Sequence, residues 1–132
     1  MRLAAVFVGF PLVATMLNGL IMGSRHFFLS EWPGHAYHHL ARQITLDCGV
    51  AVLGLLLLYR FVRGAKEVWL CWALLLVGAS IFGGYWLSSI LVGLGEPGLL
   101  PYSARATYTA IYVLGVALLW REHTTETLSS DV

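Results

Sequence analysis

Residues 48–59 read CGVAVLGLLLLY, an apolar run without a charged side chain, and this run decides the fold class of the 132-residue chain. The apolar character continues on both sides, so the predicted segment extends over 41–62. About 20 mostly apolar residues are enough for a helix to cross the roughly 30 Å hydrocarbon core of a bilayer. The stretch therefore predicts a membrane-spanning helix.

The composition of the whole chain supports a membrane protein. Apolar residues make up 58% and charged residues 11%, whereas a soluble domain has about 25% charged residues. A soluble domain of this size would leave much of that apolar surface in water. The composition also excludes intrinsic disorder, a coiled coil and a soluble disulfide scaffold. The net charge of +1, without a basic tract, excludes nucleic acid as a partner.

Three further segments have the length and composition of membrane spans. We expect spans over 3–23, 41–62, 68–94 and 103–120, followed by a polar, disordered tail at 121–132. The predicted fold is therefore all-α, an integral membrane four-helix bundle in a single membrane domain. The first span is interpreted as a retained anchor, because its apolar run is longer than that of a signal peptide.

The distribution of Lys and Arg predicts the orientation of the bundle. With four spans, both termini and the short connection at 63–67 share one side of the membrane. That side holds Arg2, Arg60, Arg63, Lys66 and Arg121, and the other holds Arg25, Arg42 and Arg105. Cytoplasmic loops are enriched in basic residues, so the excess of five against three predicts cytoplasmic termini. Aromatic residues expected at the inner interface are Tyr59, Trp69, Trp72 and Trp120.

Small residues supply candidate helix-packing faces. Gly19 and Gly23 form a GxxxG pattern on the first span, and Ser80, Gly84 and Ser88 recur every four positions on the third. Helices associate in membranes through close packing of such residues. These faces can hold the bundle together, or one of them can dock a partner protein.

The two cysteines, Cys48 and Cys71, lie at different expected depths in the membrane. Their depths differ by more than about 10 Å, whereas a disulfide requires Cα atoms within about 7 Å. We therefore expect two free thiols that pack as small apolar side chains.

The first connection, expected at 24–40, concentrates histidines. His35, His38 and His39 follow one another closely, and His26 falls on the same side of the membrane. If this segment is helical, His35 and His39 share a face at a spacing that can chelate a metal ion. A Zn or Cu site formed by these histidines, with or without Asp47, and axial ligation of haem b are alternatives to a plain interfacial role.

The string at 35–39 resembles one histidine box of membrane di-iron desaturases and alkane hydroxylases. The resemblance covers five residues, and that family requires several such boxes to fill two iron coordination spheres. A di-iron enzyme in this chain alone is therefore excluded.

Asp47 is the only acidic residue inside a predicted span. Charged groups in membranes face a bundle interior or find a partner. We expect an ion pair with Arg42 or Arg105, and a proton- or ligand-binding role is the alternative. The sequence contains no recognisable nucleophile with a base, phosphate loop or paired carboxylates.

The segment from Leu40-Ala41-Arg42 through Asp47 into the apolar run 49–55 resembles the small bacterial four-helix membrane proteins grouped with the DoxX family. The resemblance covers about a third of the chain. It implies a bacterial inner-membrane protein, and some members of that group are partners of membrane oxidoreductases. The histidine-rich first connection departs from the family pattern.

These observations lead to one expected function and one competing function. We expect a non-catalytic accessory subunit that packs, among membrane lipids, against partner subunits of a larger membrane complex, without a cofactor of its own. The competing interpretation is a metal- or haem-binding membrane redox protein that uses the histidine cluster.

Overall fold

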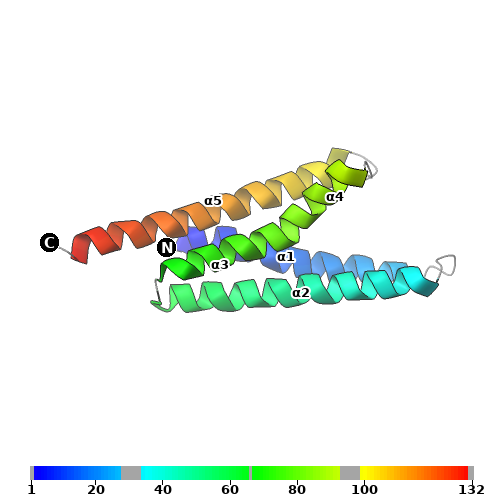
Figure 1. The fold of residues 1–132 in the computed structure, drawn as a ribbon, viewed down its shortest axis with the longest axis horizontal. Coiled ribbons are helices and arrows are strands. Elements are labelled where there is room, and N and C mark those ends of the chain that lie inside the picture. The colour runs from blue at the N-terminus through cyan, green and yellow to red at the C-terminus, as the bar shows by residue number, and fades with distance from the viewer. Residues whose placement is uncertain (1, 28–33, 66, 93–98, 131–132) are drawn as a thin grey trace.

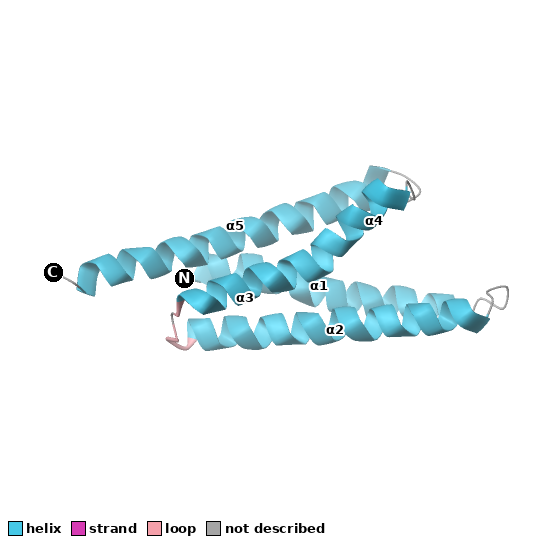
Figure 2. Cartoon of the chain, in the orientation of Figure 1, coloured by secondary structure: helices cyan, strands magenta, loops and turns pink. Residues whose placement is uncertain are grey.

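The computed structural model of the chain describes residues 2–27, 34–65, 67–92 and 99–130. In chain order the elements are α1 (Arg2–Phe27), α2 (Gly34–Val62), α3 (Val68–Gly78), the π-helical turn η1 (Ala79–Gly83), α4 (Gly84–Val92) and α5 (Leu99–Ser130). Helix accounts for nearly all of these described residues, and no strand occurs among them (Figure 2). The predicted all-α class is confirmed.

The helices form four rods, because α3, η1 and α4 follow one another as one bent rod (Figure 1). Helix α1 packs against α2 and α5, and α3 packs against the same two helices. The core between them is built from large side chains of every rod, among them Leu12, Phe61, Leu74 and Tyr112. Both chain ends and the α2–α3 turn lie at the same end of the bundle (Figure 1).

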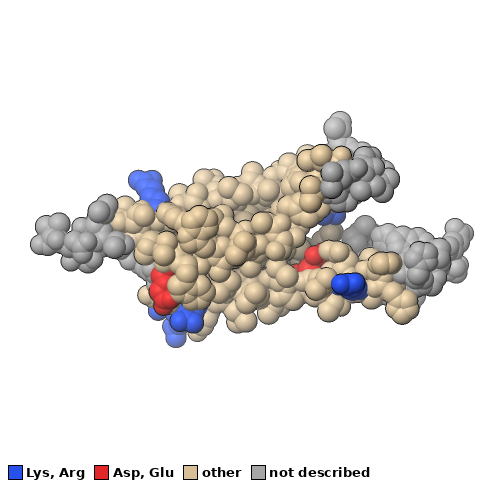
Figure 3. Space-filling model, in the orientation of Figure 1, with Lys and Arg blue, Asp and Glu red and all other residues tan. Residues whose placement is uncertain are grey.

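Among the described residues, three helices are long and apolar enough to cross a membrane, over Arg2–Ile21, His38–Val62 and Val68–Leu87. Large apolar side chains such as Leu3, Leu56 and Leu76 are exposed on the outside of the bundle. Charged side chains on the face shown in Figure 3 form two separate groups, with an uncharged band between them. Such a surface suits lipid, so the chain is a membrane protein with transmembrane helices.

Helix α5 is not among the helices that meet these requirements. Its apolar part lies between Arg105 and Arg121, which shortens the stretch that hydrocarbon could surround. The predicted span over 103–120 is therefore helical but is not confirmed as a membrane crossing.

Several predicted boundaries were wrong because they relied on polarity alone. Helix α1 continues to Phe27 and α2 begins at Gly34, so most of the connection predicted at 24–40 is helical. Helix α5 begins at Leu99, before the span predicted over 103–120, and the tail predicted to be disordered is helical through Ser130. A polar segment without a helix-breaking residue can continue a helix beyond its apolar part, because backbone hydrogen bonding does not depend on side-chain polarity.

The end of the bundle at the α2–α3 turn carries an aromatic belt, which we define as Tyr59, Trp69, Trp72 and Trp120. The rings of Trp72 and Trp120 meet edge to face, with centroids 5.0 Å apart, and join α3 to α5. Trp69 donates a hydrogen bond to Glu67. Amphipathic rings favour the headgroup level, so this belt marks one membrane interface.

The turn at 63–67 is tight, as predicted. Gly64 has a φ of 110°, a left-handed conformation that favours glycine. The N–H groups of Gly64 and Ala65 donate to the carbonyls of Phe61 and Arg60, each at 3.2 Å, and close the end of α2. This geometry sets α2 and α3 side by side.

Tyr112 of α5 provides the central contact between α5 and α3. Its ring is buried and occupies the space left by the missing side chain of Gly78, where a Cβ would lie only 2.8 Å from Cδ1 of Tyr112. Its hydroxyl donates a 2.7 Å hydrogen bond to the carbonyl of Leu74. Phe82 also packs against the ring, with centroids 5.4 Å apart. The tyrosine therefore needs a glycine at 78 and a backbone acceptor at 74.

Two other glycines make equally close contacts. A Cβ on Gly54 of α2 would lie 2.9 Å from both Leu12 and Val77, so Gly54 lets α1 and α3 approach α2 at one point. A Cβ on Gly115 of α5 would lie 2.9 Å from the backbone carbon of Phe7. Pro11 has no backbone N–H, so the carbonyl of Phe7, four residues earlier in α1, lacks its usual helical hydrogen bond. Helix α5 therefore packs against α1 at the point where one backbone hydrogen bond of α1 is missing.

We predict that Gly78→Ala destabilises the bundle by about 1–3 kcal/mol, because the added methyl group overlaps with the Tyr112 ring. Chemical unfolding in detergent measures this change. Gly84→Ala is the matched control, since a Cβ there meets nothing within 4 Å. Equal destabilisation by both substitutions would contradict the packing described for Gly78.

We also predict that Tyr112→Phe lowers the free energy of unfolding by about 1 kcal/mol, the size of a hydrogen bond within a membrane protein. The ring contacts with Phe82 and Gly78 remain, so the loss isolates the bond to the Leu74 carbonyl. Tyr59→Phe serves as the control, because Tyr59 is exposed. An unchanged stability of Tyr112→Phe would show that this bond contributes nothing.

Candidate functional site

One side of the bent third rod has no neighbour within the described chain. We call this surface the open face and define it by Leu76, Ser80, Gly83, Gly84 and Leu87, which are all exposed. Leu76 and Leu87 are 68% and 57% exposed. The open face follows α3 across η1 into α4, and it combines small residues at its centre with large apolar residues at both ends.

The π-helical turn η1 lies in the middle of the open face. The hydroxyl of Ser80 donates a 2.9 Å hydrogen bond to the carbonyl of Leu76, one turn earlier. Such bonds satisfy the hydroxyl inside a membrane helix and frequently accompany a bend. Single π-helical turns within α-helices are often found at functional sites.

Beyond η1, α4 diverges from α2, and the rods separate toward this end of the bundle (Figure 1). Two contacts hold α4 to α5 instead. The indole N–H of Trp86 donates to Oγ1 of Thr109 at 3.1 Å, and the guanidinium of Arg105 lies 4.1 Å from the ring centroid of Tyr85. The bend therefore directs Trp86 to α5 and leaves the centre of the open face without a helix across it.

The glycines separate into those used inside the chain and those left open. A Cβ on Gly19 would lie 3.8 Å from Ile44 and 4.0 Å from Cys48, so the GxxxG helix face already packs against α2. At Gly83 and Gly84 a Cβ would meet nothing within 4 Å. Among the described members of the two predicted small-residue faces, Gly19 contacts α2, whereas Ser80 and Gly84 on the third rod are exposed.

Two members of the predicted packing set, Gly23 and Ser88, are helical in backbone, but their side-chain surroundings lie outside the described residues. The described part of the set, Gly19, Ser80 and Gly84, is thus divided between one internal contact and one open surface.

The structure places the predicted histidines near the end of the bundle where α1 and α2 are connected. His35, His38 and His39 all belong to α2, so the condition that this segment is helical is met. His38 and His39 are exposed, and the side chains of His26 and His35 lie outside the described residues. Among the described residues, no three metal-ligating side chains come together.

Asp47 lies further along α2 and has a different partner from the one expected. Its carboxylate accepts a 2.9 Å hydrogen bond from Nε2 of Gln43, one turn earlier, and Arg105 stacks on Tyr85. At 1.5 Å per residue, Asp47 lies roughly 18 Å along the helix from His35. That separation is too large for both side chains to bind one metal ion.

Cys48 and Cys71 are free thiols, as predicted. Cys71 is buried in α3, and Cys48 is half-buried against the face of Gly19. Both serve as small packing residues.

The sequence interpretation missed three residues that close the bundle, namely Gly78, Tyr112 and Gly115. These residues stand inside apolar segments of the sequence, where two glycines and a tyrosine are the signal that could have identified them. Which glycine receives which side chain depends on the pairing of α5 with α1 and α3, and the spacing along one helix does not contain that information.

The chain matches no family model, and comparisons with curated proteins and with solved structures give no match either. The resemblance to DoxX-like proteins therefore remains a prediction from the residues at 40–55.

Proposed function

We propose that the chain is a non-catalytic accessory subunit that packs through its open face against a larger membrane protein complex. The observation that supports this proposal is the pair Gly83 and Gly84, which lie exposed at mid-helix without a side chain within 4 Å of their Cβ positions. A glycine in a helix interior costs about 1 kcal/mol relative to alanine. In membranes such positions let two helices approach closely.

The bend at η1 supports the same proposal. It moves α4 away from α2 and so keeps the centre of the open face free within the chain. Leu76 and Leu87 are exposed on either side of Gly83 and Gly84 along the open face. Both leucines can pack against a partner helix that contacts the two glycines. The shape fits a transmembrane helix of a partner subunit, and the DoxX-like resemblance suggests a membrane oxidoreductase as the complex.

The proposed arrangement in the membrane has four spans and cytoplasmic termini in a bacterial inner membrane. Helix α5 places Tyr112, Val116 and Leu119 in the same buried core as the other three rods, which supports its presence in the bilayer. The excess of basic residues at the end that holds both termini supports the orientation.

We predict that Gly84→Val abolishes co-purification of the partner subunits in a mild detergent, because the added side chain keeps the partner helix away. Mass spectrometry of the affinity-purified complex measures this loss. Gly49→Val is the matched control, since Gly49 is also an exposed helical glycine with nothing within 4 Å of its Cβ position. A complex that survives Gly84→Val, or that is lost equally with Gly49→Val, would contradict the proposal.

The same preparation separates this function from the competing redox function. We predict that the double variant His35→Ala with His39→Ala keeps the partner subunits, because both residues lie far along α2 from the bend at η1. Elemental analysis and a visible spectrum of the purified chain give the second measurement. About one Zn, Cu or haem per chain that disappears in the double variant would favour the redox protein.

A further inference from the structure

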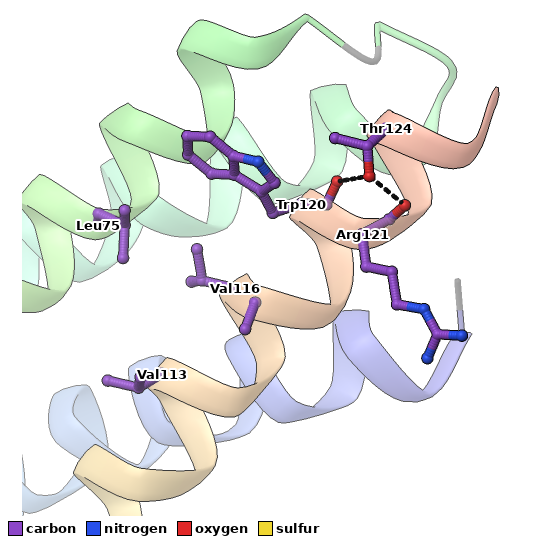
Figure 4. A pocket seen from close by; sticks show the side chains of 7 residues that line it. Leu75, Val113, Val116, Trp120, Arg121 and Thr124 are labelled. Atoms are coloured by element: carbon purple, nitrogen blue, oxygen red, sulfur yellow. Dashed lines mark hydrogen bonds between the residues drawn. The ribbon is translucent and has the colours of Figure 1, made fainter. Parts of the chain in front are cut away.

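A groove of about 480 Å³ follows the outer surface where α5 lies beside α3 (Figure 4). Its floor is apolar and consists of Leu75 from α3 with Val113, Val116 and Ala117 from α5. Trp120 and Arg121 follow at the end of the groove that reaches the aromatic belt. The groove therefore changes from apolar to cationic along the direction that runs from the membrane interior toward its interface.

Arg121 is the cation of this groove, and its side chain is exposed. In the part of the chain that the structure describes, no carboxylate pairs with its guanidinium. Two other arginines at this end are engaged, since a guanidinium nitrogen of Arg60 lies 3.8 Å from a carboxylate oxygen of Glu67 and Arg63 stacks on the ring of Tyr59. Thr124, beside Arg121, donates its hydroxyl to the backbone carbonyls of Trp120 and Arg121.

We propose that this groove binds one acyl chain of an anionic phospholipid, whose phosphate is held by Arg121. The planar guanidinium matches phosphate geometry with two parallel hydrogen bonds. Basic pockets between transmembrane helices are a recurrent binding mode for anionic headgroups. The groove volume of about 480 Å³ falls within the roughly 300–1,000 Å³ typical of small-molecule sites.

The length of the groove also fits a lipid tail. From Val113 to Arg121 the helix rises by about 12 Å at 1.5 Å per residue. One leaflet of the hydrocarbon core is about 15 Å thick, half of roughly 30 Å. If Arg121 binds the phosphate, the part of the lipid's acyl chain nearest the headgroup would lie along Ala117, Val116 and Val113. There it would also contact Leu75 of α3.

The groove suits a lipid better than a protein helix. Close helix association needs small residues at the contact, and the residues of that kind are on the open face. In the groove, Ala117 is the one small residue among larger apolar side chains. A narrow, flexible acyl chain can occupy such a surface more closely than a helix about 10 Å wide.

The test titrates the delipidated chain in detergent with phosphatidylglycerol or with phosphatidylcholine of identical acyl chains, and native mass spectrometry counts the bound lipids. The intact chain is expected to prefer phosphatidylglycerol. Arg121→Gln is expected to weaken phosphatidylglycerol binding about tenfold, the size of one lost charge-assisted hydrogen bond. Phosphatidylcholine binding is expected to weaken less, because its choline ammonium already offsets the phosphate charge. Arg63→Gln is the control, because Arg63 lies at the same end of the bundle and does not line the groove.

A second substitution tests the apolar part independently. Ala117→Phe fills the groove from an exposed position and is expected to weaken binding of both lipids. Ala110→Phe is its control, since Ala110 is exposed on the same helix and does not line the groove. Circular dichroism of each variant verifies that the helices remain.

Three outcomes would overturn the proposal. Equal binding of the two lipids would show that the net negative charge of the headgroup is not recognised. An equal loss of phosphatidylglycerol binding in Arg63→Gln would show that the preference for this lipid comes from the overall positive charge at this end of the bundle and not from Arg121. Occupation of the groove by a second copy or a partner chain, seen as a crosslink from Ala117→Cys that lipid does not compete away, would replace the lipid by a protein.

Discussion

The structure depends on the insertion of Tyr112 into the notch at Gly78. A buried tyrosine hydroxyl needs an acceptor, and the Leu74 carbonyl supplies one at 2.7 Å because the missing side chain of Gly78 lets the ring reach the backbone of α3. The bond fixes the height and the rotation of α5 relative to α3. The packing of α5 against α1 at Gly115, and the alignment of Trp72 with Trp120, then follow from that register.

Some glycines are in close contact with a neighbouring helix of the chain, and others have no such contact. Gly54, Gly78 and Gly115 each receive a side chain or backbone of a neighbouring helix, and they account for the tight centre of the bundle. The bend at η1 begins immediately after Gly78 and places Gly83 and Gly84 beyond the reach of α2 and α5. The same rod thus has a closed half that stabilises the fold and an open half that is available to a partner helix.

The two surfaces proposed to bind other molecules follow from different physical requirements. The open face offers small residues, which allow a second helix to approach. The groove along α5 offers an apolar channel that ends at a cation, a combination that a phospholipid satisfies with both its tail and its phosphate. Because the aromatic belt lies at the cationic end, the groove is placed at the depth where headgroups meet hydrocarbon.

The sequence by itself determined that the chain is helical and belongs in a membrane. Long apolar segments such as 48–59 must form helices in a membrane, since the backbone polar groups in hydrocarbon must be hydrogen-bonded within their own helix. It also determined the tight turn at Gly64 and the two free thiols. Polarity misplaced the ends of α2 and α5, because helical hydrogen bonding continues through polar residues such as His38 and Thr124. Only the tertiary structure decided which small residues pack inside the chain and which remain open. That choice depends on which side chain of one helix reaches a glycine of another, as Tyr112 reaches Gly78, and the relative register of two helices is a property of their contact.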